Sequence, residues 1–175
     1  MTFGSVGTFA IEAGELVQFK SIQGYYIQFR FWVDNSPFGD WDDRIPLVPS
    51  IKYTQEFCEN SKKRFNDACL NLSSSDLVHQ LRDAFYSYDY KSGSSYVSDL
   101  RCIHHLDDVG MGAVVDRYGI VVVSFSCEID RIVVKNLENN IIEKDISLAH
   151  GVIDSACTEY ISWGRSKLGW GDNIG

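Results

Sequence analysis

The feature that most constrains the fold is a strictly alternating segment, Tyr25–Val33. One parity holds Tyr25, Ile27, Phe29, Phe31 and Val33, and the other holds Tyr26, Gln28, Arg30 and Trp32. A period of two with aromatic and β-branched residues predicts a strand with one face in the core. Thr8–Phe19 alternates in a similar way, and Gly14 is expected to mark a bulge within it. The two segments are predicted to form a hairpin around Ser21–Gly24.

Helical spacing of apolar residues appears in the middle and at the end of the chain. One helix is predicted to begin near Ser50. A second is expected to be capped by Ser75 and carries apolar residues at helical spacing as far as Tyr88. The last begins after Ser147 and is expected to end at Gly164, because glycine is common just beyond a helix C-terminus.

Further strands are predicted in the second half of the chain. Gly119–Ser126 is apolar at both parities, which is typical of a central strand buried on both faces. Ile129–Lys135 is its expected hairpin partner, Ile141–Ile146 is a short strand, and Leu100–Leu106 is a further candidate. This order is not a regular β-α-β alternation. The predicted class is therefore α+β, a mostly antiparallel sheet of about five to six strands with two to three helices packed on one face.

Length and composition favour one acidic domain that does not bind nucleic acid. The 175 residues are expected to form a single domain over 1–163, followed by a Gly-rich tail over 164–175. A net charge of -8 opposes binding to phosphates or to anionic membranes and suits a basic partner. The five cysteines are widely spaced and odd in number, which indicates reduced thiols and a cytoplasmic location. The sequence shows neither a signal peptide nor an apolar run long enough to cross a bilayer.

The strongest candidate for a binding surface is the acidic, turn-rich segment Asp40–Arg44. Its carboxylates flank Trp41, and tryptophan is enriched at binding hot spots while complementary charge speeds encounter. A second acidic stretch would contribute if it lay beside the first in space. The expected partner-binding residues are Asp34, Asp40, Trp41, Asp42, Asp43, Asp107 and Asp108. The alternative is that Trp41 packs inward as a core anchor among ordinary turn aspartates.

Motifs for catalysis are weak by comparison. The glycines at Gly110–Val115 lack the spacing and context of a dinucleotide-binding turn, and no phosphate-binding loop or nucleophile elbow occurs. Cys102, His104 and His105 are the best candidate metal ligands. In a strand, however, the two histidines would point to opposite faces, so a structural role is favoured. We therefore predict no catalytic residues, no metal and no cofactor, and keep a metal-dependent enzyme as the weaker alternative.

A family resemblance rests on the first part of the chain. Phe9–Glu12 reads FAIE, Trp32–Asn35 reads WVDN and Phe38–Asp42 reads FGDWD. This pattern resembles the immunity protein 42 family of bacterial polymorphic toxin systems. Later segments match more loosely, so the resemblance covers nearly the whole chain while its specific motifs lie near the N-terminus.

The resemblance implies a cytoplasmic antidote rather than an enzyme. Such a protein binds a cognate toxin domain that a neighbouring cell delivers, often by contact-dependent growth inhibition. It blocks the toxin's active site or an essential surface. Many such toxins are nucleases with basic channels, and the toxin is expected to be basic and encoded by the adjacent gene. The alternative is a protein-interaction module, such as an adaptor, without a toxin partner.

Overall fold

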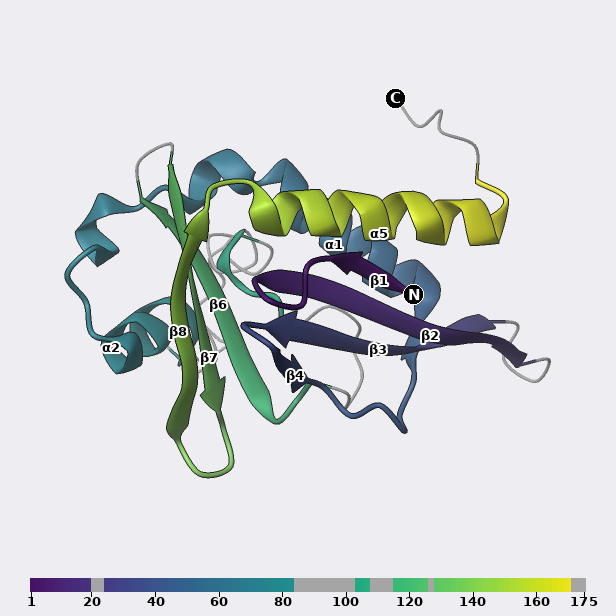
Figure 1. Cartoon of the computed structure of the whole chain (residues 1–175), viewed down its shortest axis with the longest axis horizontal. Helices are drawn as coiled ribbons and strands as arrows, with labels where there is room; N and C mark the ends of the chain where they lie inside the picture. Colours follow the sequence, from purple (N-terminus) through teal and green to yellow (C-terminus); the bar gives the residue numbers. More distant parts are fainter. Residues whose placement is uncertain (20–23, 84–102, 108–114, 126–127, 171–175) are drawn as a thin grey trace, which may run out of the picture.

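The computed structural model describes residues 1–19, 24–83, 103–107, 115–125 and 128–170. Within them the strands form two antiparallel sheets (Figure 1). Sheet A has the order β1-β2-β3-β4, with β5 also paired to β3, and sheet B has the order β6-β7-β8. The strands are β1 (Thr2–Gly4), β2 (Phe9–Phe19), β3 (Gly24–Val33), β4 (Ser36–Phe38), β5 (Ile45–Pro46), β6 (Tyr118–Phe125), β7 (Ile129–Asn136) and β8 (Ile141–Ala149). The α+β class is confirmed, but the strands form two sheets where a single sheet was expected.

The predicted hairpin of β2 and β3 is confirmed, with Phe9 opposite Val33 and Phe19 opposite Gly24. The pairing register shifts between Ala13 and Leu16, which confirms the bulge expected at Gly14. Because an extra residue reverses the parity of a strand, Leu16 packs against the core after the bulge, whereas Phe19 is 40% exposed.

Two helices cover the inner face of sheet A, α1 (Leu47–Glu59) and α5 (Val152–Leu168) (Figure 1). Tyr160 of α5 is fully buried, packs edge-on against Phe29 of β3 and shares a 2.5 Å hydrogen bond with Ser50 of α1. The prediction that Gly164 ends the last helix is wrong. Gly164 lies inside α5, where a Cβ would come within 2.5 Å of Ile51, so glycine is needed there for close helix packing.

Strand β6 is buried on both of its faces, as is most of β7, whereas β8 is largely exposed or half-buried, and this burial explains the apolar character of β6. Ile120 and Val122 join the core shared with sheet A, while Val121 and Val123 face a second cluster. The expected central place of β6 is wrong, since it is the first strand of its sheet. Single bridges, Phe65 to Ser124 and His105 to Val121, pair with it outside the sheet. β6 is therefore buried on both faces because a different hydrophobic cluster packs on each face, not because it lies in the middle of its sheet.

The second cluster is closed by the short helix α2 (Ser74–Val78). Ser73, not Ser75, caps this helix by accepting a hydrogen bond from the amide of Asp76. A π-helical turn continues it over His79–Asp83, and the rest of the predicted helix lies outside the described residues. Residues 103–107 contain a helical turn and one bridge rather than the predicted strand.

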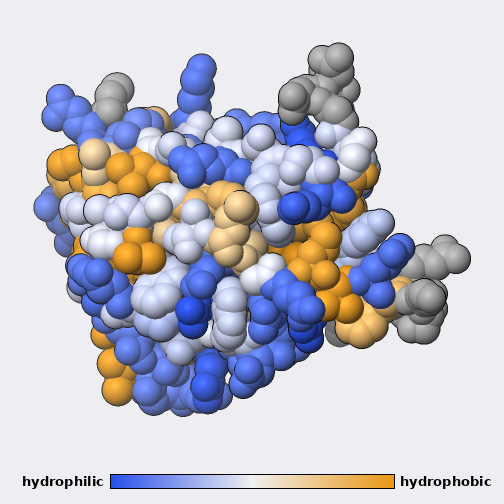
Figure 2. Space-filling view, turned by 45° about the vertical axis from the view of Figure 1, so that its right-hand side comes forward, coloured by the Kyte–Doolittle hydropathy of each residue, from blue (hydrophilic) through white to orange (hydrophobic). Residues whose placement is uncertain are grey.

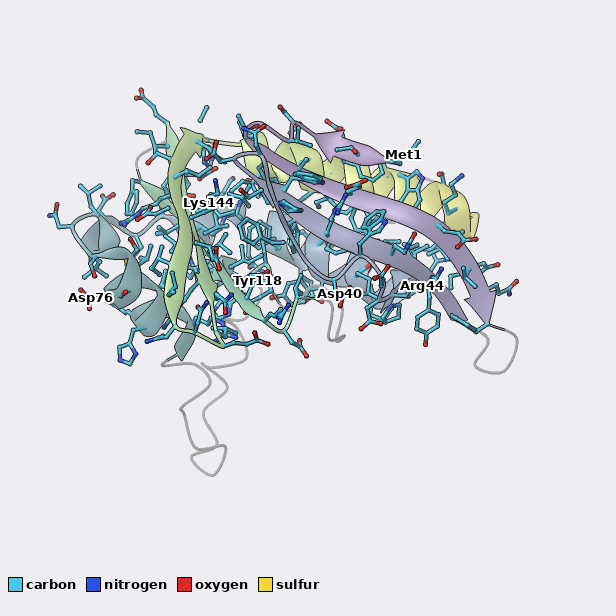
Figure 3. The ribbon with its side chains drawn as sticks, turned by 60° about the horizontal axis from the view of Figure 1, so that its bottom comes forward. Met1, Asp40, Arg44, Asp76, Tyr118 and Lys144 are labelled. Atoms are coloured by element: carbon cyan, nitrogen blue, oxygen red, sulfur yellow. The ribbon has the colours of Figure 1, made fainter. Side chains whose placement is uncertain are left out.

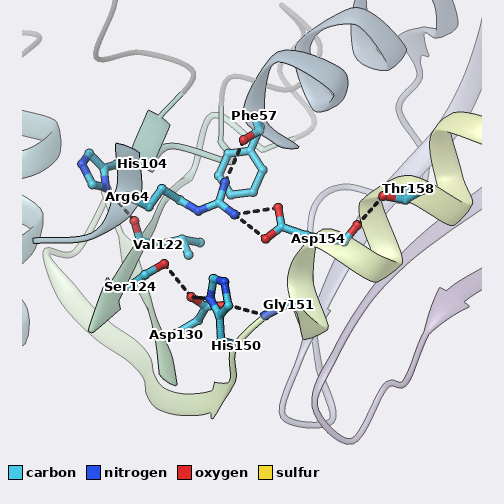
Figure 4. A network of polar contacts seen from close by, with 10 residues as sticks. All are labelled: Phe57, Arg64, His104, Val122, Ser124, Asp130, His150, Gly151, Asp154 and Thr158. Carbon is cyan, nitrogen blue, oxygen red and sulfur yellow. Dashed lines mark hydrogen bonds and ion pairs between the residues drawn. The ribbon is translucent and has the colours of Figure 1, made fainter. Parts of the chain in front are cut away.

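A buried carboxylate joins sheet B to the start of α5 (Figure 4). Asp130 accepts hydrogen bonds from the hydroxyl of Ser124 at 2.6 Å, the Nδ1 of His150 at 2.9 Å and the amide of Gly151 at 3.1 Å. Gly151 takes a φ of +87°, which lets the chain turn directly from β8 into the helix.

Candidate partner-binding face

The face of sheet A that points away from α1 and α5 is not covered by any described helix (Figure 3). It presents the second parity of the alternating strands, the side chains that do not enter the core. We call these residues, with the loop that packs on them, the outer face: Glu12, Gln28, Arg30, Trp32, Asp40, Trp41, Asp42 and Asp43. All of them are partly or fully exposed.

An ordered stack of side chains occupies the middle of the outer face. The guanidinium of Arg30 lies 4.4 Å from the ring centre of Trp41 and 4.8 Å from that of Trp32. A single oxygen of Glu12 accepts hydrogen bonds from Nε of Arg30 and Nε1 of Trp32, both at 2.7 Å. Burial raises the pKa of Glu12, but these two hydrogen bonds and the charge of Arg30 lower it below its ordinary value.

Trp41 reaches the sheet because two residues of the hairpin make room for it and hold it. A Cβ at Gly14 would lie 2.9 Å from Cζ2 of Trp41, so only glycine allows the indole this close. Gln28 donates a hydrogen bond to the carbonyl of Trp41 at 3.0 Å and accepts one from the amide of Glu15 at 3.2 Å. Trp41 is thus partly buried on the outer face and does not belong to the core.

The aspartates beside Trp41 are exposed and shape their own loop. Asp40 accepts a hydrogen bond from the amide of Asp42 at 3.0 Å, and Asp43 accepts one from the amide of Arg44 at 2.9 Å. The guanidinium of Arg44 is paired with Glu15 at 3.0 Å. Since the cation of this loop already has a carboxylate partner, the loop presents a surplus of negative charge.

Asp34 lies in the turn between β3 and β4, where it and Asn35 take positive φ values of 45° and 61°. Asparagine and aspartate tolerate this backbone shape better than most residues. Its carboxylate is paired with Lys144 of β8 at 2.9 Å, and its side chain is 47% exposed. Asp34 therefore ties sheet A to sheet B, and its charge is largely compensated.

Asp107 does not fit the expected binding surface. Its side chain is 4% exposed, is paired with Arg82 at 2.8 Å and accepts the amide of Ile120 at 3.2 Å. Burial raises its pKa despite the nearby charges of His105 and Arg82. This carboxylate stabilises the interior, where a partner cannot reach it. Asp108 lies outside the described residues.

The histidines of the candidate metal site are also interior groups. Nδ1 of His104 lies 2.8 Å from the carbonyl of Val122, and Nε2 of His105 lies 2.6 Å from that of Leu81. Burial lowers the pKa of His104 to about 4. Cys102 lies outside the described residues, and within the described ones no three histidine, cysteine or carboxylate side chains gather as metal ligands do. These contacts give both imidazoles a structural role.

Apolar side chains on the surface are scattered. In the view of Figure 2 the hydrophobic colour forms separate patches divided by hydrophilic surface. The larger exposed apolar side chains come from different elements: Met1, Val6, Phe19, Phe65, Leu70, Ile129 and Ile141. Among the described helices, none has both the length and the apolar character needed to cross a membrane.

The sequence pattern points to the acidic loop Asp40–Asp43 but not to the residues on which the loop packs. The residues predicted from the sequence to bind a partner do not include Glu12, Gly14, Arg30 and Trp32. The available signal was the alternation of the strands, which places Arg30 and Trp32 on the side away from the core. Their contact with Trp41 depends on how the loop folds back, which local patterns do not show.

Comparison with known proteins agrees with this architecture. The model of the family described as Immunity protein 42 matches residues 1–163. A solved structure, the crystal structure of CdiI from Burkholderia dolosa AUO158, superposes with a TM-score of 0.65 at 14% identity. The superposition covers 93% of this chain and 99% of that one, so the two share a fold. No curated protein sequence matches the chain significantly. The match over residues 1–163 shows that the chain belongs to the immunity protein 42 family.

Proposed function

We propose that this chain neutralises a cognate bacterial toxin by binding it directly in the cytoplasm, without catalysis. The observation that carries the proposal is membership of the immunity protein 42 family over residues 1–163. The shared fold with a protein described as CdiI supports a role of the contact-dependent inhibition type. His104, His105 and Asp107 lie in the interior, where hydrogen bonds to the surrounding backbone favour a structural role for them over catalysis.

We further propose that the toxin is basic and docks on the outer face. Asp40, Asp42 and Asp43 project from a loop that is fixed to a rigid sheet through Trp41. Complementary charge raises the rate of encounter with a basic partner and disfavours partners of like charge. A nuclease that binds phosphates with a basic surface would present such a partner, and covering that surface would block its substrate.

The toxin domain encoded next to this chain is the appropriate test partner. Its production in a sensitive bacterium should arrest growth, and co-production of this chain should restore growth. The purified chain should also co-elute with a catalytically inactive form of that domain at equal stoichiometry. Growth arrest that persists in the presence of well-folded chain, with no co-elution, would refute the proposal.

Reversing the charge of the loop should slow association. In the variant D40K/D42K/D43K we expect the association rate constant at low salt to fall by at least about tenfold and to depend less on salt. Stopped-flow mixing with the inactive toxin domain measures both quantities.

A matched control changes the net charge equally at another place. Glu59, Asp67 and Glu128 are exposed and lie outside the outer face. The variant E59K/D67K/E128K should associate within about threefold of the wild-type rate, because only general steering is reduced. Equal slowing in both variants would mean that total charge, and not this loop, guides the toxin.

A further inference from the structure

We infer that Trp41 and Trp32, with Arg30 held between them, form a preformed anchor for an arginine or lysine side chain of the toxin. The inference rests on the proposed function and adds to it the chemistry of the central contact. It concerns the stack on the outer face rather than the aspartates around it.

The stack is already ordered before any partner arrives. Glu12 holds both Arg30 and Trp32, while Gln28 and Gly14 fix the position of Trp41. Binding orders flexible side chains at a cost in conformational entropy, so side chains that are already fixed lose less on binding. Partly exposed tryptophans on a rigid sheet have the character of residues that dominate binding energy.

Charge decides which kind of side chain the stack accepts. Glu12 compensates Arg30, and Glu15 compensates Arg44. Arg117, whose charge acts on Asp40, is itself paired with Glu138 at 3.0 Å. Among the described residues, the charges beside the stack that have no ion-pair partner are therefore the carboxylates of Asp40, Asp42 and Asp43. Indole faces attract cations, and tryptophan does so more strongly than tyrosine or phenylalanine. Since Arg30 already lies over one face of each ring, an incoming cation is attracted by the solvent-exposed part of the rings and by the loop together.

The competing explanation is that the stack only fastens the loop to the sheet. A fluorescence titration separates the two. The sequence has four tryptophans, so the variant W163F/W170F keeps only Trp32 and Trp41 as indoles. Trp163 packs beside Phe3 and Tyr160 on the opposite side of sheet A, where phenylalanine preserves the aromatic contact.

Titration of this variant with a tryptophan-free, catalytically inactive form of the toxin domain should change its emission intensity or wavelength, saturating at one equivalent. If calorimetry shows binding while the emission stays unchanged, the stack is not at the interface and the inference is wrong. If the wild-type chain binds no toxin at all, the proposed function itself fails.

Substitutions at Trp41 test the chemistry of the contact. We expect the dissociation constant to rise at least about tenfold in Trp41→Leu, which keeps apolar bulk but has no ring, and less in Trp41→Phe. As a control, Phe65→Ala truncates another exposed aromatic, outside the outer face, and should change affinity less than about twofold. Equal affinities of the Leu and Phe variants would show an apolar contact and would overturn the cation assignment. Far-ultraviolet circular dichroism confirms that each variant is folded.

Discussion

Replacing Asp154 by asparagine is expected to lower the free energy of unfolding by about 3 kcal/mol, because it leaves a buried cation without its counter-charge. Arg64 is fully buried and donates to both oxygens of Asp154, at 2.6 Å and 2.5 Å, and to the carbonyl of Phe57 at 2.7 Å (Figure 4). Its guanidinium also lies 4.1 Å from the ring centre of Phe57. Asparagine keeps the size of the side chain but removes the charge.

The matched control is another arginine–carboxylate pair that lies in solvent. Arg117 and Glu138 are 58% and 61% exposed, and such pairs contribute less than about 1 kcal/mol. Urea unfolding of Asp154→Asn and Glu138→Gln, monitored by circular dichroism, gives both values. Equal small losses would contradict a stabilising role for the ion pair between Asp154 of α5 and Arg64, which ends the 3-10 turn Ser61–Arg64 that follows α1.

The second large effect is a dependence of stability on pH that comes from His104. Burial lowers the pKa of His104 to about 4, compared with an ordinary value of 6.5. Between these values the unfolded chain binds a proton at this group and the folded chain does not. Acidification from pH 6.5 to 4 therefore favours unfolding. At about 1.4 kcal/mol for each pKa unit, His104 alone accounts for a loss of about 3 kcal/mol.

Asp107 works in the opposite direction, because its raised pKa lets the folded chain bind a proton first as the pH falls. A comparison with His104→Asn isolates the histidine, since asparagine can still donate to the carbonyl of Val122 but does not titrate. Between pH 7 and pH 4 the wild type should lose about 3 kcal/mol more unfolding free energy than the variant does. A difference that stays constant with pH would contradict the buried, neutral imidazole.

Local patterns in the sequence predicted the parts of the fold that depend on neighbouring residues. The alternation of Tyr25–Val33 gave the strand and its core face, and Gly14 gave the bulge. The division into two sheets was not predicted, because it depends on pairings between distant segments. Gly164 was misread for the same reason, since Ile51, on another helix, makes glycine necessary there.

The residues of the candidate site could also be predicted only where local sequence determines them. The predictions that depend on distant contacts were wrong or missing. Asp40–Asp43 lie in an exposed loop, as turn-rich composition suggested. Asp107 was grouped with them on charge alone, but Arg82 and the amide of Ile120 hold it inside. The sequence alone does not show whether a carboxylate forms an ion pair with a largely buried arginine in the folded chain. The indole stack likewise needs Gly14 and Arg30 from two different strands.

The central claim is that the toxin binds at the outer face. Hydrogen–deuterium exchange of the chain, free and in complex with the inactive toxin domain, tests this claim most directly. Binding at the outer face predicts slower amide exchange in residues 39–44, where the amides of Asp42 and Arg44 are held only by nearby aspartates. It predicts no change in α2 or β8. Slower exchange confined to α2, β7 and β8, with residues 39–44 unaffected in a saturated complex, would contradict binding at the outer face.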